Sequence, residues 1–169
     1  FASCASYNVT IRLDYVDTQI QMYIKDYNLQ LCPDFQRGHV WNEQQQTDYI
    51  EYILKGGSSG RTIYFNHPGW GYGKDGEMVL VDGLQRITAV RLFLNNELKV
   101  FGHLYSEFTG YLSMSVDNLM FNVNNLQRRS EVLEWYLDIN TGGVVHTEEE
   151  LNRVRGLLLE QKEGRLKYG

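Results

Sequence analysis

The stretch Val81-Asp82-Gly83-Leu84-Gln85-Arg86-Ile87-Thr88-Ala89-Val90 decides the fold, because a strand pattern gives way to a helix pattern within it. The apolar run from Met78 to Val81 is typical of a buried strand. Beyond the Asp-Gly pair, apolar residues recur at the spacing of one helix face, at Leu84, Ile87, Val90 and Leu94. The sequence therefore predicts a strand that passes directly into an amphipathic helix.

This junction brings a carboxylate, a glycine and a guanidinium together in the chain. Backbone N–H groups at a helix start attract anions, and an arginine can bind a phosphate through two hydrogen bonds. Gly83 permits a tight turn and a close approach of the backbone to a ligand. We expect a phosphate site here, with Asp82 and Arg86 as its catalytic residues. The structural alternative is that Asp82 caps the helix or pairs with Arg86.

The periodicity elsewhere predicts a mixed order of strands and helices. Predicted strands cover residues 9–13, 62–65, 78–81, 98–101 and 119–123, and predicted helices cover 18–25, 43–55, 84–96, 131–137 and 147–161. The 169 residues fit a single domain, residues 1–169, with a substantial core. Because strands and helices do not alternate strictly, the order favours a compact α+β fold.

The composition of the chain limits the classes of partner that it can bind. Apolar residues make up 43% of the chain and aromatic residues 13%, which are globular values. No apolar run approaches the roughly 20 residues that span a bilayer, so we expect no membrane contact. The net charge of −5 means that any contact with nucleic acid must be local. Neither the two cysteines nor the four histidines have the spacing of metal ligands, so we expect no metal site formed by the protein alone. With only two cysteines, which do not form a redox pair, we expect a reduced, cytoplasmic setting.

Two further segments carry candidate ligand-binding residues. Gln36 and Arg37 follow Pro33 in a loop, where an amide can pair with a base edge and a guanidinium with a phosphate. Alternatively, Arg37 pairs with a nearby carboxylate. Asn140 and Thr141 begin an Asn-Thr-Gly-Gly loop that could offer N–H groups to an anion, although such loops more often only end a helix.

These segments, in this order, closely resemble the ParB/sulfiredoxin-like family, which includes the N-terminal domains of GmrSD-type modification-dependent restriction enzymes and related phage-defence proteins. The resemblance rests on residues 33–41, 81–90 and 139–143 and covers about residues 28 to 158. It implies a small mixed sheet flanked by helices, with a nucleotide phosphate at the Gly-x-x-Arg turn. It also implies nucleoside-triphosphate binding or hydrolysis, and in some members the sensing of modified DNA.

The chain departs from the family pattern at informative positions. Sulfiredoxins have a cysteine where this chain has Leu84, so sulfinic-acid reduction is not expected. ParB-type proteins have consecutive basic residues where this chain has Gln85 and Arg86. The restriction enzymes usually add a C-terminal His-Asn-His nuclease, and no such motif is visible here. Cleavage of DNA by this chain alone is therefore not expected.

The function that we expect from the sequence is nucleotide binding and hydrolysis of a nucleoside triphosphate, with Mg²⁺ as the accompanying ion. Arg86 would hold the phosphate, and Asp82 would position metal or water. The other residues that we expect to bind the nucleotide or its phosphates are Gln36, Arg37, Gly83, Leu84, Gln85, Asn140 and Thr141. The alternatives are phosphotransfer to a small molecule or modified DNA, and non-catalytic recognition of modified DNA. Possible partners include a second copy of the chain or a downstream nuclease domain.

Overall fold

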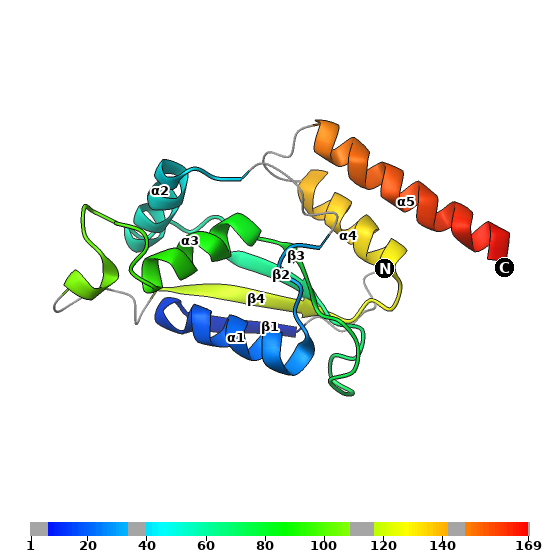
Figure 1. Cartoon of the computed structure of the whole chain (residues 1–169), viewed down its shortest axis with the longest axis horizontal. Helices are drawn as coiled ribbons and strands as arrows, with labels where there is room; N and C mark the ends of the chain where they lie inside the picture. The colour runs from blue at the N-terminus through cyan, green and yellow to red at the C-terminus, as the bar shows by residue number, and fades with distance from the viewer. Residues whose placement is uncertain (1–6, 34–39, 109–116, 142–147, 169) are drawn as a thin grey trace.

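The computed structural model describes residues 7–33, 40–108, 117–141 and 148–168 (Figure 1). The described elements, in chain order, are β1 (Tyr7–Arg12), η1 (Leu13–Tyr15), α1 (Val16–Tyr27), α2 (Glu43–Leu54), β2 (Thr62–Asn66), β3 (Val79–Asp82), α3 (Leu84–Leu94), η3 (Tyr105–Glu107), β4 (Asn118–Asn124), α4 (Arg129–Thr141) and α5 (Glu148–Tyr168). This set of helices and strands confirms the predicted α+β class.

The four strands form one mixed sheet in the order β1-β4-β2-β3. β4 is antiparallel to β1 and parallel to β2, and β2 is antiparallel to β3. On the outer side of β3, Gln30 forms a single parallel bridge with Val79. β3 therefore has a partner on each side, and its carboxyl end leads into α3.

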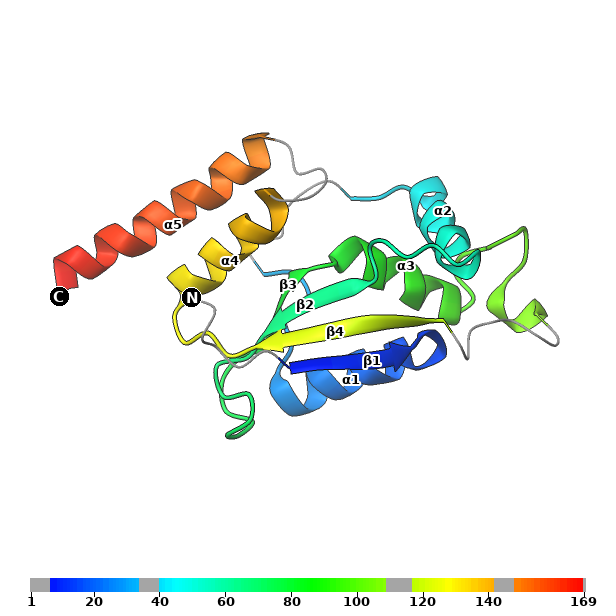
Figure 2. The same cartoon turned by 180° about the vertical axis from the view of Figure 1, so that it is seen from behind.

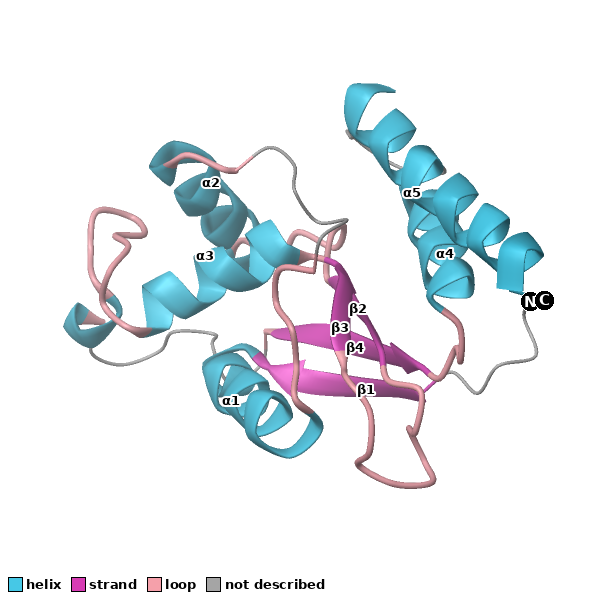
Figure 3. Ribbon diagram, turned by 45° about the vertical axis from the view of Figure 1, so that its right-hand side comes forward, coloured by secondary structure: helices cyan, strands magenta, loops and turns pink. Residues whose placement is uncertain are grey.

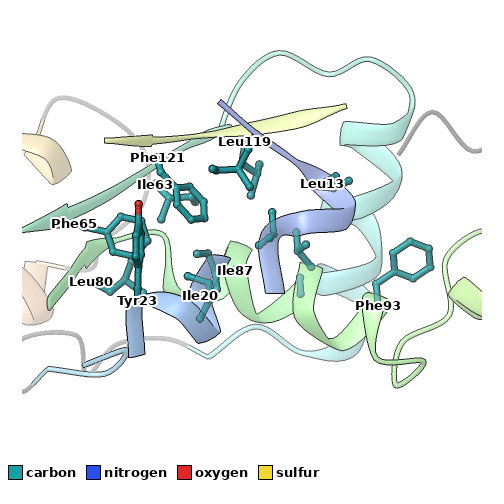
Figure 4. Close-up of a cluster of buried hydrophobic side chains, with 14 of the residues drawn as sticks. Leu13, Ile20, Tyr23, Ile63, Phe65, Leu80, Ile87, Phe93, Leu119 and Phe121 are labelled. Carbon is teal, nitrogen blue, oxygen red and sulfur yellow. The ribbon is translucent and has the colours of Figure 1, made fainter. Parts of the chain in front are cut away.

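The sheet separates two groups of helices, as Figure 3 shows: α1, α2 and α3 lie on one side, and α4 and α5 on the other. The main core lies between the sheet and the first group, and Figure 4 shows its large side chains, among them Tyr23, Phe65, Phe93 and Phe121. All four of these aromatic side chains are almost completely buried. Together with aliphatic residues such as Ile50 and Ile53 of α2, they remove apolar surface from water, which is the main force that holds the three helices on the sheet.

A second, smaller core lies beneath the helical pair. α4 and α5 run side by side in opposite directions, as Figures 1 and 2 both show. The buried residues of this core are Val81, Leu126, Val132, Leu133, Tyr136 and Val154. Tyr64 of β2 packs edge-on against Trp135 of α4, with ring centroids 5.7 Å apart. β3 is therefore covered on both faces, which explains why its sequence is apolar without alternation.

Local signals explain where some elements begin and end. The side chain of Asn42 accepts a bond from the Gln45 N–H at 2.8 Å, and the Gln45 side chain accepts one from the Asn42 N–H at 3.0 Å. This reciprocal capping box starts α2 where the sequence predicted. Of the helices described, none has both the length and the apolar character that crossing a bilayer requires.

The predicted strand at residues 98–101 is wrong. Val100 and His103 exchange two backbone hydrogen bonds, of 2.8 and 3.0 Å, as an isolated bridge. Between them, Phe101 has a φ of +51° and Gly102 a φ of +78°. Two successive positive φ angles reverse the chain in a tight turn, so the apolar residues enter the core from a turn instead of a strand.

Candidate functional site at the junction of β3 and α3

The predicted junction is present: β3 ends at Asp82, Gly83 is the N-cap, and α3 begins at Leu84. Gly83 has a φ of +116°, which side chains rarely tolerate. A Cβ atom at this position would lie 2.7 Å from Cδ1 and 3.0 Å from Cγ2 of Ile63. The junction therefore requires glycine for two reasons, one in the backbone and one in the packing against β2.

Arg86 lies one turn into α3 and points into the protein. Its Nη2 donates to Oδ2 of Asp82 at 2.9 Å, and its Nη1 donates to the carbonyl oxygen of Thr62 at 2.9 Å. The Arg86 and Asp82 side chains are only 17% and 19% exposed. The pairing of Asp82 with Arg86, one of the structural alternatives, is therefore confirmed. Capping by Asp82 is not, because Gly83 is the N-cap and α3 has no side-chain cap.

The surroundings of Arg86 include a tyrosine that the sequence did not single out. A Cβ at Gly60 would lie 3.8 Å from Cδ of Arg86, so the glycine loop before β2 passes close to this side chain. The hydroxyl of Tyr49 donates to the Gly60 carbonyl at 2.7 Å. Burial raises the pKa of Tyr49 to about 12, although the positive charge of Arg86 acts in the opposite direction. Tyr49 therefore stays protonated near neutral pH and fixes the loop beside Arg86.

Gln85 connects α3 to the chain that precedes α2. Its Oε1 accepts a hydrogen bond from the Trp41 backbone N–H at 2.9 Å, and the Trp41 ring packs on Tyr49 at a centroid distance of 5.5 Å. Gln36 and Arg37 lie outside the described residues. The Trp41 backbone itself is thus held at the junction by Gln85.

The prediction of a loop at Asn140 and Thr141 is wrong, because both residues belong to the last turn of α4. Asn140 is 7% exposed, and its Nδ2 donates to the Tyr136 carbonyl at 2.7 Å. The side chain thus bonds to the preceding turn of its own helix, which satisfies the buried amide group. The role of Asn140 and Thr141 in binding phosphate stays a prediction, and the two following glycines lie outside the described residues.

The contacts that hold Arg86 include several that sequence reasoning missed. Thr62 contributes only its carbonyl oxygen, and a backbone acceptor has no signature in the sequence. The loop at residues 56–60, before β2, also contributes, because a Cβ at Gly60 would lie 3.9 Å from Nη1 of Arg86. Leu84 packs its side chain against the main core, which leaves its backbone N–H as the group that could meet a ligand. Among the described residues, no group of three or more His, Cys, Asp or Glu side chains is placed to hold a metal ion.

The fold and this junction define an α+β module with an arginine held at a strand-to-helix turn. A family model described as the GmrSD restriction endonuclease, N-terminal domain, matches residues 20–113. The match spans more than half of the 169 residues, and the chain belongs to this family. The chain is thereby a restriction-system module, a class tied to defence against phage. Searches of curated proteins and of solved structures found no match.

Proposed function

We propose that this restriction-system domain binds a nucleoside triphosphate at the junction of β3 and α3 and hydrolyses it. The observation that carries the proposal is the fixed position of Arg86, between Oδ2 of Asp82 and the Thr62 carbonyl, at the start of α3. A guanidinium that is already immobilised loses little freedom when it binds a phosphate. Catalysis of phosphoryl transfer depends mainly on such preorganised positive charge.

The first turn of α3 supplies the second part of the site. The first hydrogen bond of the helix runs from the Ile87 N–H to the Gly83 carbonyl, at 2.9 Å. The N–H groups of Leu84, Gln85 and Arg86 therefore precede the helical bonding pattern. With glycine as the N-cap, no capping side chain covers them. These groups and the helix dipole would favour a phosphate oxygen at this position.

Arg86 and Asp82 would have different roles: Arg86 would bind the phosphate, and Asp82 would accept a proton. An arginine has five N–H donors, and the two bonds that hold Arg86 leave others for the transferred phosphoryl group. Asp82 uses Oδ2 to position Arg86, and its Oδ1 would accept a proton from the attacking water or from a water bound to Mg²⁺. Mg²⁺ normally binds nucleotides through one or two carboxylates, phosphate oxygens and waters, which a single aspartate fits. The bound ion would neutralise phosphate charge.

The test is phosphate release from ATP and from GTP in the presence of Mg²⁺. Arg86→Ala should lower turnover by about 10² to 10³-fold, the effect of removing one preorganised donor from a reacting charge. Arg91→Ala is the matched control, because Arg91 lies on the same helix and pairs with Asp17 at 2.6 Å with similar burial. Arg91→Ala should lose stability but keep its turnover. Equal turnover in wild type and Arg86→Ala, or none with either nucleotide, would refute the hydrolase proposal.

Recognition of modified DNA is a second candidate, favoured by the loop between β2 and β3. Tyr72 at its tip is 92% exposed. Nearby, Trp70 packs on Tyr7 and Tyr27 with ring centroids 5.5 and 4.9 Å apart, so the base of the loop is anchored. Exposed aromatic rings can stack on unpaired bases. DNA binding that needs no nucleotide and is weakened by Tyr72→Ala or Gln36→Ala would support this function, and binding unchanged in both variants would exclude it.

A further inference from the structure

A cleft of about 370 Å³ lies beside the outer edge of β3, away from the Arg86 site. Its walls come from the segment at Gln30 and Pro33, the end of β2, the start of β3 and the first turn of α4. Neither Asp82 nor Arg86 lines it. The volume lies in the range of small-molecule sites, about 300 to 1,000 Å³.

The floor of this cleft is apolar and already formed. Leu126 and Val132 line it and belong to the second core, and Val79 packs against that core. Asn66, which is 2% exposed, holds Leu126 through two hydrogen bonds: Nδ2 donates to the Leu126 carbonyl at 3.1 Å, and Oδ1 accepts from its N–H at 2.8 Å. Gln127 is fixed in turn by its Nε2, which donates to the Pro68 carbonyl at 2.6 Å. Binding here would need little rearrangement of the wall.

Two arginines give the cleft its charge. Arg128 and Arg129 both line it, at the point where α4 begins. The Arg128 side chain is 66% exposed, and its Nε lies 3.7 Å from Oε1 of Glu131, too far for a strong ion pair. Glu77 is the acidic residue among the described lining residues. The guanidinium groups therefore make the rim beside α4 the place where an anionic group would bind, with the apolar floor next to it.

We propose that this cleft binds a small phosphorylated molecule of the nucleoside-monophosphate class. Its phosphate would contact Arg128 and Arg129, and its base would lie against Val79 and Leu126. The phosphate of a DNA backbone offers the same chemistry. A small ligand fits better, because a recessed apolar floor suits a single planar group and a protein of net charge −5 does not suit a duplex. This second site goes beyond the proposed hydrolysis, and its arginines lie after the family match, which ends at residue 113.

Isothermal titration of the full chain with AMP, with inorganic phosphate and with a short DNA duplex tests the proposal. AMP should bind more tightly than inorganic phosphate, because only AMP uses the apolar floor. Arg128→Gln should weaken AMP binding by about tenfold or more, the usual effect of losing a hydrogen bond to a charged group. Glu77→Gln should strengthen it by up to about fivefold, because a facing negative charge is removed.

Two control variants separate this site from other sources of binding. Arg12→Gln removes an exposed arginine that pairs with Asp14 on η1, and it should leave AMP binding unchanged. Because AMP could also occupy the proposed Arg86 site, the titration is repeated in Arg86→Gln, where AMP binding should remain and should still be weakened by Arg128→Gln, so a failure here does not depend on the hydrolase proposal. Far-ultraviolet circular dichroism confirms that each variant is folded, which the exposure of Arg128 favours. No binding of AMP, binding that Arg128→Gln does not weaken, binding lost in Arg86→Gln, or preference for the duplex would overturn the proposal.

Discussion

Replacing Gly83 with alanine tests the physical basis of the junction. The backbone at Gly83 has a φ of +116°, and such a conformation costs an alanine about 1–3 kcal/mol. The new Cβ would also lie 2.7 Å from Cδ1 of Ile63, and overpacking of this kind costs about 1–3 kcal/mol. The free energy of unfolding should therefore fall by about 2–6 kcal/mol, a large part of the 5–15 kcal/mol typical of a domain. Each kcal/mol should lower Tm by about 2–4 °C in a chain of this size.

Urea unfolding followed by circular dichroism measures this loss, and three further variants divide it into its parts. Gly102→Ala has a φ of +78° but open space around its Cβ, so it should show the backbone cost alone. Gly73→Ala has neither a positive φ nor a close neighbour, and its stability should change by less than about 0.5 kcal/mol. Ile63→Val removes the nearest methyl group and should reduce the cost of Gly83→Ala in the double variant. Equal stability of Gly83→Ala and Gly73→Ala would refute both the backbone cost and the packing cost at Gly83.

Three other changes have a predicted direction. His67 is completely buried, and burial lowers the pKa of its imidazole below the value of about 6.5 in the unfolded chain. The folded state therefore binds a proton less readily than the unfolded chain, and the free energy of unfolding should fall as the pH drops from about 7 to about 5. Urea unfolding at both pH values should show a smaller decline in His67→Phe. Asn42→Ala removes the reciprocal cap of α2 and should lower the free energy of unfolding by about 1 kcal/mol in urea unfolding, and an unchanged value would contradict the capping role. Gly156 lies on the exposed side of α5, and a Cβ there would have nothing within 4 Å. Gly156→Ala should therefore raise the free energy of unfolding by about 1 kcal/mol in the same assay. An unchanged or lower free energy would argue against a regular helix there.

The sequence by itself determined the elements whose signals are local. The apolar run before Asp82, the glycine after it and the helical spacing beyond it set the junction of β3 and α3, because each acts within a few residues of the chain. The same holds for α2, where Asn42 and Gln45 complete a cap three residues apart. The family resemblance was also confirmed, since the match over residues 20–113 includes two of the three segments on which it rests, 33–41 and 81–90.

Only the tertiary structure decided what each polar side chain contacts. Arg86 bonds to the carbonyl of Thr62, which lies 24 residues away in the chain, and a backbone acceptor leaves no trace in the sequence. Asn140, predicted in a loop, lies in α4, where its side chain donates to the Tyr136 carbonyl. The cleft beside Arg128 exists because β2, β3 and α4 meet there. Local patterns report backbone preferences over a few residues, whereas bonding partners and cavities depend on which distant segments the sheet brings together.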